Sequence, residues 1–401
     1  MMTLEKLECW MLRAPLAAPV VNAFGAMTTR PALFVRLSAS DGAWGWGEVW
    51  CNFPQVGGEH RARLIESLFA PLVRGQQAEE PMALTAELER RTRVMAIQCR
   101  EAGPFAQIVA AIDQAAWDMA ARRANKPLFA FLGGKNNRVR AYASGIGPDD
   151  VVETALKKQK QGYRAFKLKV GMDAVRDRRN LADMRAALGP FAALMVDANQ
   201  GWSTGDAAQR IEELAPSRPH WVEEPIGADA SHDQWTALSR KAGVPLAAGE
   251  NLFGLAQFEQ AIERKYLRFM QPDVGKWGGV SGCFEVAKKA IAAGAVYCPH
   301  WLAGGIGLAA SMHLLAAAGG NGFAEVDANE NPLREEVFSP PVEEGSMTLP
   351  DKPGQMASIA KKLSKAKVNI EYAYGTTAPS GGVLIMRVSD IPKARKLLKI
   401  K

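Results

Sequence analysis

Short apolar runs alternate with longer segments of helical periodicity from residue 138 to residue 327, and this pattern constrains the fold of the 401-residue chain more than any other feature. It is typical of βαβ units, which build a parallel sheet. The expected strands lie at 138–145, 164–171, 193–199, 220–225, 244–250, 267–273, 295–300 and 322–327. Eight parallel strands with intervening helices fit a closed (β/α)-barrel.

Charged residues or histidine stand at the ends of six successive strands. They are Asp197, Glu223, Glu250, Asp273, His300 and Glu325. Their separations of 26, 27, 23, 27 and 25 residues each match one strand-and-helix unit. We therefore expect all six on the C-terminal rim, where barrel enzymes keep their active sites. A single carboxylate after a strand is more often a helix cap or a surface charge, but six in phase favour a functional site.

Three of these carboxylates follow adjacent strands. Asp197, Glu223 and Glu250 would repel one another unless a cation or bound protons offset their charge. Three carboxylates that leave positions open for water and substrate oxygens suit Mg²⁺, a hard cation with octahedral geometry. We therefore expect a Mg²⁺ cofactor.

Two lysines share one strand. Lys167 and Lys169 are two residues apart, so their side chains project to the same side of the sheet. Solvated lysines are the usual interpretation of such spacing. The neighbours Phe166, Leu168 and Val170 indicate a buried strand instead. A crowded lysine beside another cation has a reason to lose its proton and act as a base.

His300 is one of five histidines in the chain. It could be a core histidine. Asp273 ends the preceding strand and could orient the imidazole and raise its basicity, as in other carboxylate–histidine pairs. We favour the interpretation as a catalytic dyad.

The rest of the chain predicts further units. Residues 1–125 predict an α+β capping domain, with an antiparallel meander whose last turn is Asp41-Gly42. The barrel domain is expected over residues 126–332. Residues 333–350 form an irregular segment that returns to the capping domain, and residues 351–401 predict a small βαββα-like unit.

The net charge of +7 is concentrated in the tail. Residues 352–401 hold 11 Lys/Arg and two acidic residues, which is +9 and leaves 38 Lys/Arg and 40 Asp/Glu, or −2, for residues 1–351. A nearly neutral body argues against a nucleic-acid partner.

The cysteines and the N-terminal residues indicate the cellular compartment of the protein. The five cysteines form no CxxC pair, which argues against a disulfide framework or a thiolate zinc site. The first residues carry charges where a secretory signal would be apolar, and no run approaches the roughly 18 apolar residues that span a bilayer. We expect a cytoplasmic protein with no membrane partner.

The strand ends resemble those of the mandelate racemase and muconate lactonizing branch of the enolase superfamily, over residues 1 to about 350. The matching pieces are KLK at 167–169, VDAN at 196–199, VEEP at 222–225, AAGE at 247–250, QPD at 271–273, CPH at 298–300 and AEVD at 324–327. Together they are highly specific, whereas KxK or EEP alone would be weak. The resemblance implies a (β/α)7β barrel with an N-terminal α+β capping domain.

The resemblance also implies roles for these residues. The three carboxylates Asp197, Glu223 and Glu250 would bind Mg²⁺. Lys169 would be a base, and Lys167 would help neutralise the substrate carboxylate.

On the opposite face, the resemblance implies that His300, oriented by Asp273, is the second acid or base. Glu325 would hydrogen-bond a carboxylate or enolate oxygen, and Asn199 would contact the substrate. An enolate next to a carboxylate carries two negative charges, which preorganised positive charge from Mg²⁺ and lysine would stabilise.

Two loops of the capping domain would close over the site and set specificity, as the family implies. They are Val21 to Gly25 and Trp50 to Gln55. Phe24, Asn52 and Phe53 are the expected substrate-binding residues, and the alternative is that the two phenylalanines only anchor these loops.

We expect a Mg²⁺-dependent dehydratase, a carbon–oxygen lyase that acts on an acid sugar. A racemase or epimerase of a 2-hydroxy acid would use the same two bases, and a non-catalytic binding or regulatory protein is a third alternative. Residues from about 351 to 401 resemble part of an ACT domain, a small ligand-binding regulatory module. The expected partners are therefore a small carboxylate substrate, a second copy of the chain in a homo-oligomer, and a small effector at the tail.

Overall fold

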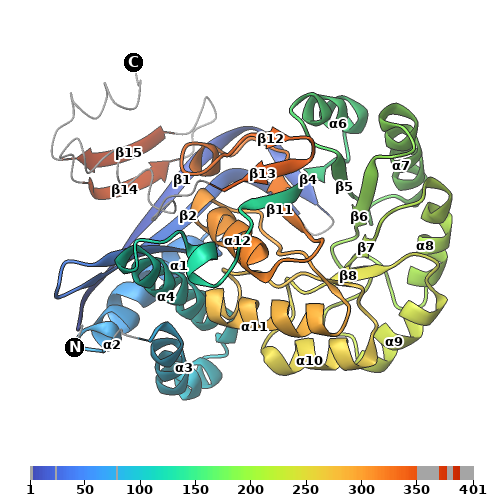
Figure 1. Ribbon diagram of the computed structural model, residues 1–401. Helices are drawn as coiled ribbons and strands as arrows, with labels where there is room; N and C mark the ends of the chain where they lie inside the picture. Colours follow the sequence, from blue (N-terminus) through green and yellow to red (C-terminus); the bar gives the residue numbers. More distant parts are fainter. Residues whose placement is uncertain (1–2, 23–24, 78–79, 350–369, 377–382, 389–401) are drawn as a thin grey trace.

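The computed structural model describes residues 3–22, 25–77, 80–349, 370–376 and 383–388. An N-terminal α+β domain lies beside a barrel whose helices surround its strands (Figure 1). Within the described residues, no helix is long and apolar enough to cross a membrane.

The N-terminal domain begins with an antiparallel sheet in the order β1 (Leu4–Asn22), β2 (Gly25–Ala39) and β3 (Trp44–Val49). The predicted meander is confirmed. The turn between β2 and β3 has Gly42 at φ 81°, a left-handed conformation that favours glycine, and the Gly42 N–H donates to the carbonyl of Ala39 (2.9 Å).

Helices follow this sheet along the chain. They are α1 (Gly57–Leu64), the π-helical turn η1 (Ile65–Phe69), α2 (Ala70–Val73), α3 (Pro81–Gln98), α4 (Ala102–Arg123) and α5 (Leu128–Phe131). The buried helix α4 lies directly on β3 because two glycines leave room for its backbone. A Cβ added to Gly45 or Gly47 would come within 2.0 Å of the carbonyl oxygen of Ala115 or Ala111, respectively.

All eight expected barrel strands are present and parallel. They are β4 (Arg138–Ile146), β5 (Ala165–Lys169), β6 (Ala193–Asp197), β7 (Val222–Glu223), β8 (Leu246–Ala248), β9 (Phe269–Met270), β10 (Val296–Tyr297) and β11 (Phe323–Asp327). The hydrogen-bonded order runs from β10 down to β4, and β11 pairs with β4. Gly322 lies against β10, because an added Cβ would be 1.8 Å from the carbonyl oxygen of Tyr297.

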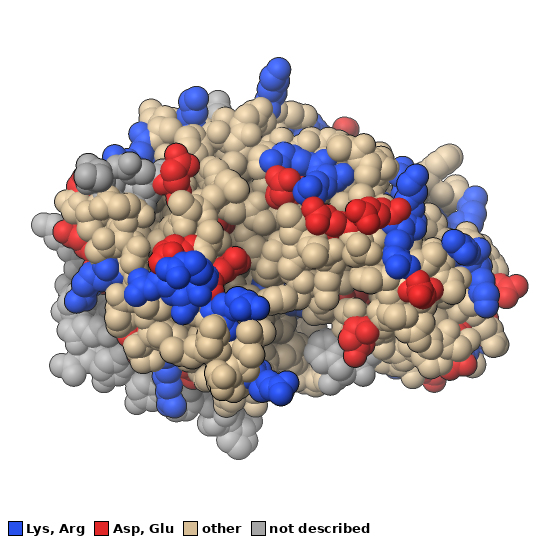
Figure 2. All heavy atoms as spheres, turned by 90° about the horizontal axis from the view of Figure 1, so that it is seen from below, with Lys and Arg blue, Asp and Glu red and all other residues tan. Residues whose placement is uncertain are grey.

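Seven helices follow the first seven strands, which makes the barrel a (β/α)7β barrel. They are α6 (Val151–Lys160), α7 (Ala174–Leu188), α8 (Ala207–Leu214) with the 3₁₀ turn η2 (Ala215–Ser217), α9 (His232–Lys241), α10 (Leu255–Arg264), α11 (Gly279–Ala292) and α12 (Gly305–Ala318). Among the described residues, basic and acidic side chains lie interspersed on the face seen in Figure 2.

Apolar side chains fill the barrel interior toward the N-terminal ends of its strands. The centres of the Trp221 and Phe269 rings lie 4.7 Å apart, and Tyr142 and Phe323 pack against Trp221. These residues come before the charged positions along their strands. The apolar layer therefore leaves the charged side chains at the C-terminal end of the barrel.

The segment after the barrel differs in part from the prediction that residues 333–350 return to the capping domain. The short helix α13 (Pro332–Glu335) does contact β1 and β2. The hairpin of β12 (Val342–Glu343) and β13 (Ser346–Thr348) instead extends the barrel sheet, because β13 pairs antiparallel with β4. The backbone groups of the hairpin thus find their partners on a barrel strand.

In the tail, the structure describes two strands. β14 (Ile370–Thr376) and β15 (Val383–Val388) correspond to the two strands predicted in the tail; they pair antiparallel, and β14 lies close to β1 (Figure 1). The expected helices of the tail fall outside the described residues. The ACT-like interpretation and the domain boundaries therefore stay predictions.

Candidate active site

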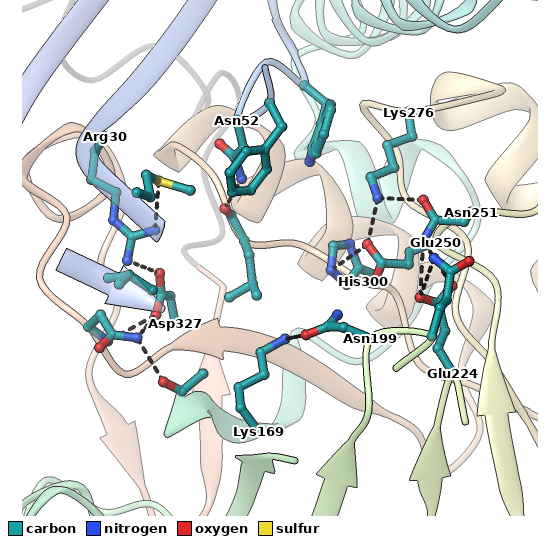
Figure 3. Close-up of a pocket in the computed structure, with 18 residues that line it drawn as sticks. Arg30, Asn52, Lys169, Asn199, Glu224, Glu250, Asn251, Lys276, His300 and Asp327 are labelled. Carbon is teal, nitrogen blue, oxygen red and sulfur yellow. Dashed lines mark hydrogen bonds and ion pairs between the residues drawn. The ribbon is translucent and has the colours of Figure 1, made fainter. Parts of the chain in front are cut away.

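A cavity of about 290 Å³ opens at the C-terminal rim of the barrel, under the N-terminal domain (Figure 3). The predicted residues that line it are Asn52, Phe53, Lys169, Asn199, Glu250 and His300. The other predicted residues of the described chain do not line the cavity and are 2% exposed or less; they are Lys167, Asp197, Glu223, Asp273 and Glu325.

Lys167 is fully buried among three carboxylates. Its Nζ lies 2.5 Å from Glu223 Oε1, 2.7 Å from Glu325 Oε1 and 3.5 Å from Asp197 Oδ2. Burial alone would lower the pKa of this ammonium, but the charges of Glu223 and Glu325 raise it well above its ordinary value. Lys167 is therefore a fixed positive charge.

Lys169 reaches the cavity from the end of β5. Its Nζ donates to Asp197 Oδ2 (2.6 Å) and Asn199 Oδ1 (2.8 Å). Burial and the charge of Lys167 favour loss of the proton, but Asp197 outweighs them and raises the pKa of Lys169. The expectation that crowding alone makes Lys169 a base is therefore wrong for this arrangement, because the adjacent carboxylate stabilises the ammonium.

The three predicted metal ligands lie on neighbouring strands. Asp197 is in register with Glu223, and both side chains are 1% exposed, whereas Glu250 is 8% exposed. Burial raises the pKa of Glu223 to about 7; Lys167 opposes this change and Asp197 adds to it. Such closely spaced buried carboxylates need positive charge nearby.

Ammonium groups supply that charge. Across the described part of the chain, no three His, Cys, Asp or Glu side chains gather their donor atoms into a ready metal site. Each predicted ligand instead contacts a lysine: Asp197 contacts Lys169, Glu223 contacts Lys167 and Glu250 contacts Lys276. The donor set still fits Mg²⁺, because it consists of three carboxylates on adjacent strands of one rim.

Sequence reasoning missed Lys276. This lysine follows Asp273 by three residues, in the loop between β9 and α11. Its Nζ donates to Glu250 Oε2 (2.5 Å) and Asn251 Oδ1 (3.0 Å), and it lies 4.7 Å from the centre of the Trp50 ring. Its position just after the strand end that carries Asp273 was the signal that could have revealed it.

The predicted dyad is formed. His300 Nδ1 lies 2.6 Å from Asp273 Oδ2, and the backbone N–H groups of Gly275 and Lys276 donate to Asp273 Oδ1 (2.8 and 3.0 Å). Burial alone would lower the pKa of His300, but Glu250, Glu325 and the hydrogen bond with Asp273 raise it to about 9. The imidazole is therefore protonated at neutral pH.

Glu325 is held by hydrogen bonds below the cavity. Ser144 Oγ donates to Glu325 Oε1 (2.5 Å), and the backbone N–H of Trp301 donates to Oε2 (3.0 Å). Burial would raise the pKa of Glu325, but Lys167 and His300 hold it below its ordinary value. Glu325 is thus an anchored anion between two cations.

Comparison with protein families decides the identity of this arrangement. Residues 7–133 match the N-terminal domain of the mandelate racemase/muconate lactonizing enzyme family, and residues 150–361 match the enolase C-terminal domain-like family. The chain belongs to this branch of the enolase superfamily. Neither match reaches the last 40 residues, so they give the ACT-like interpretation no support.

Solved structures of this branch are similar over most of the chain. A mandelate racemase/muconate lactonizing enzyme of Bordetella bronchiseptica is 48% identical, with a TM-score of 0.84 over 88% of this chain and 96% of that one. A racemase of Streptomyces coelicolor with bound magnesium is 27% identical, with a TM-score of 0.80 over 90% and 99%.

Among curated relatives, the D-galactonate dehydratase of Klebsiella pneumoniae is 30% identical over 295 residues, 70% of this chain and 74% of that one. The D-galactarolactone cycloisomerase of Agrobacterium fabrum is 27% identical over 371 residues, 88% and 95%.

Of the two capping-domain loops expected in this branch of the superfamily, the second lines the cavity through Trp50, Asn52 and Phe53, and Gly25 is the described residue of the first that lies near it. An added Cβ on Gly25 would lie 4.0 Å from the ring of Phe53, and Asn52 Nδ2 donates to the carbonyl of Leu302 (2.7 Å). Asn52 thus holds its loop to the loop after β10. Phe24 lies outside the described residues, so its role stays a prediction.

Amide side chains line much of the cavity wall, and only two of them were predicted. They are Asn52, Asn199, Gln200, Asn251 and Asn329. An amide carries both donors and acceptors, so such a wall suits a ligand with several hydroxyl groups. Asn199, Gln200, Asn251 and Asn329 each lie within a few residues of a barrel strand end, and that position is the signal that could have revealed them.

A buried ion pair also closes the wall between the two domains. Arg30 of β2 contacts Asp327 Oδ2 at 2.5 Å, with both side chains 3% exposed, and Arg30 Nε donates to the carbonyl of Glu330 (3.2 Å). Breaking such a buried pair leaves an uncompensated charge, which is strongly destabilising.

Proposed function

We propose that the protein is a Mg²⁺-dependent dehydratase of a sugar acid. The observation that carries this proposal is the convergence of Lys169, Glu250 and His300 on a single cavity, with Asp273 hydrogen-bonded to His300. The remaining predicted carboxylates and Lys167 lie directly beneath. This set of residues supports removal of a proton next to a carboxylate and loss of a neighbouring hydroxyl group.

Asp197, Glu223 and Glu250 would hold Mg²⁺ in this proposal. When bound, the cation supplies positive charge that stabilises the developing enolate. The racemase of Streptomyces coelicolor, which aligns over 90% of this chain, contains magnesium and supports this assignment.

Proton removal falls to Lys169, whose Nζ reaches the cavity. Because Lys169 Nζ donates to Asp197 Oδ2 and Asn199 Oδ1, it must first release one proton to solvent before it can accept the substrate proton. Lys167 stays protonated and neutralises negative charge on the substrate carboxylate, and Glu325 is proposed to hydrogen-bond a carboxylate or enolate oxygen.

His300 can supply the proton that dehydration needs. Burial lowers the pKa of its imidazole, but in the arrangement described Glu250, Glu325 and the hydrogen bond with Asp273 raise it to about 9, and a protonated imidazole suits donation to a departing hydroxyl. Racemisation would require the same imidazole to take a proton from substrate in one direction. Asp273 holds the ring by its Nδ1, so we assign the transfer to Nε2, which lies 3.1 Å from Glu250 Oε2.

The cavity supports a small, polyhydroxylated substrate. Its volume of about 290 Å³ is at the lower end of small-molecule pockets, and its wall is rich in amides, with Asn199, Asn251 and Asn329 among them. The D-galactonate dehydratase of Klebsiella pneumoniae is consistent with this substrate class.

A cycloisomerase is the second candidate, because a relative that covers 88% of this chain is a D-galactarolactone cycloisomerase. The deciding experiment is a screen of mono- and diacid sugars and their lactones with Mg²⁺ in D₂O. Dehydration gives a 2-keto-3-deoxy acid, cycloisomerisation gives an isomer of unchanged mass apart from deuterium, and a non-catalytic binding protein gives neither product nor deuterium exchange.

Location and assembly complete the proposal. We propose a cytoplasmic enzyme that forms a homo-oligomer and takes a small carboxylate as substrate. The tail over residues 351–401 is proposed as a regulatory unit that binds a small effector. Size measurement of the full chain and of a chain ending at residue 350 tests the contribution of the tail.

A further inference from the structure

Two side chains of the N-terminal domain hold the loops that carry the His300–Asp273 dyad. We call residues 273–278 and 300–304 the dyad loops; they lead from β9 into α11 and from β10 into α12. Glu48 of β3 bonds the loop after His300, and Gln114 of α4 bonds the residue after Asp273.

Glu48 lies at the N-terminus of α12 and is fully buried. Its Oε1 accepts the backbone N–H of Gly304 (2.6 Å), and its Oε2 accepts that of Gly307 (3.0 Å). A Cβ on Gly304 would lie 2.3 Å from Oε1, so the loop approaches as closely as glycine permits. In the described residues no basic side chain pairs with Glu48. The backbone N–H groups at the N-terminus of α12 and the helix dipole stabilise its carboxyl group instead.

Gln114 connects the backbone of Glu48 to the dyad loop of residues 273–278. Its Oε1 accepts the N–H of Glu48 (3.2 Å), while its Nε2 donates to the carbonyl of Glu48 (3.1 Å) and that of Val274 (2.9 Å). Because Val274 follows Asp273 directly, one amide connects β3 to the loop of the dyad carboxylate.

Trp301 transmits the position of α12 to His300, its neighbour in the chain. Its indole N–H donates to the carbonyl of Gly304 (2.7 Å). A Cβ on Gly275 or Gly307 would come within 2.6 or 2.1 Å of the indole ring, so the ring is packed between the two loops. A shift at Gly304 must therefore move Trp301.

We propose that Glu48 is a positioning residue, which sets the hydrogen bond between His300 and Asp273 by holding the N-terminus of α12. Through Glu48, the N-terminal domain would do more than cover the cavity. It would also hold the two residues of the dyad at their hydrogen-bonding distance. The kinetic consequences of this inference rest on the proposed function, whereas its structural consequence does not.

Glu48→Gln is the direct test, because an amide nitrogen cannot accept an N–H as either carboxyl oxygen can. We expect kcat for dehydration to fall about tenfold to hundredfold, as for a displaced catalytic group. The KM should change by less than about twofold, because Glu48 does not touch the cavity. Exchange of the substrate α-proton with D₂O through Lys169 should persist.

Trp117→Phe is the matched control. It removes another hydrogen bond between α4 and the barrel, from Trp117 Nε1 to Ser281 Oγ (2.8 Å), outside the dyad loops. Dehydration and exchange should both stay at the parent rates in this variant. Gln114→Met loses the hydrogen bond to Val274 and should show the same effect as Glu48→Gln. It takes the place of Glu48→Gln if the Glu48→Gln protein does not fold.

A measurement without substrate separates this inference from the proposed function. The downfield proton resonance of His300 Nδ1, assigned by its absence in His300→Asn, should shift or broaden in Glu48→Gln and stay unchanged in Trp117→Phe. An unchanged resonance in folded Glu48→Gln and Gln114→Met overturns the inference. Equal loss of dehydration and α-proton exchange in both variants also overturns it, because it indicates a merely structural role. Absence of exchange and turnover in the parent protein refutes the proposed function alone.

Discussion

Lys276 and His300 contact the same carboxylate oxygen. Lys276 Nζ lies 2.5 Å and His300 Nε2 lies 3.1 Å from Glu250 Oε2. Burial alone would raise the pKa of Glu250, but these two cations hold it below its ordinary value. The protein therefore already neutralises a residue that we propose as a metal ligand.

Competition between Lys276 and Mg²⁺ follows from this contact. Lys276→Met should strengthen Mg²⁺ binding, by about tenfold, because a positive charge near the metal site is removed. Titration calorimetry measures the effect. Lys288→Met is the control, because Lys288 pairs with Glu285 on the surface of α11. Unchanged or weaker binding in Lys276→Met contradicts the proposed competition.

Binding of Mg²⁺ should stabilise the folded chain. At a concentration one hundred times its dissociation constant, a ligand that binds only the folded state adds about 2.7 kcal/mol, which thermal unfolding reports as a higher Tm. Asp197→Asn, Glu223→Gln and Glu250→Gln should each diminish that increase. A Tm increase equal to that of the parent in all three variants excludes this ligand set.

The two sides of the cavity should differ in function. Lys169→Ala should lose both α-proton exchange and dehydration, whereas His300→Asn should lose dehydration but still exchange the α-proton through Lys169. A loss of about 10²- to 10⁴-fold is usual for a general acid or base. Proton NMR in D₂O follows both processes in one sample, and parent-level turnover by either variant rules out its assigned role.

Asp113 should make stability depend on pH. Burial raises its pKa to about 6 from the usual 3.8, although bonds from Ser281 and Thr85 oppose the change. The folded chain thus keeps this proton up to a higher pH than the unfolded chain. The stability gained from the protonated form is full below about pH 4 and is lost as pH rises through about 6, by about 3 kcal/mol in total.

Asp113→Asn removes that titration, so urea unfolding of both proteins isolates it. The free energy of unfolding of the parent minus that of the variant should decrease as pH rises from about 4 to about 7. A difference that is constant over this range contradicts the assignment to Asp113.

The sequence predicts the rim because each strand ends at a regular interval. Asp197 and Glu223 follow consecutive strands, so the barrel period alone places them together. The contact between Glu48 and Gly304 joins residues 256 apart, and nothing local marks it. Sequence patterns show where strands and helices recur along the chain. Contacts between two domains depend instead on how both domains pack.

Charge states are the other part that the sequence could not supply. The spacing of Lys167 and Lys169 predicts two crowded cations, and each would lower the pKa of the other. The structure adds Asp197 and Glu223 at distances of 2.6 and 2.5 Å from Lys169 and Lys167, respectively, which reverses the net effect. The sign of a pKa shift depends on such distances.

The most direct test of the proposed function is mass and NMR analysis of products from a panel of sugar acids incubated with the full chain and Mg²⁺ in D₂O. We predict that at least one substrate gives a 2-keto-3-deoxy acid with deuterium at C3, that EDTA abolishes the product, and that Lys169→Ala and His300→Asn do not form it. Turnover that survives EDTA, or the absence of any product from folded, Mg²⁺-bound protein across the panel, would contradict a Mg²⁺-dependent sugar acid dehydratase.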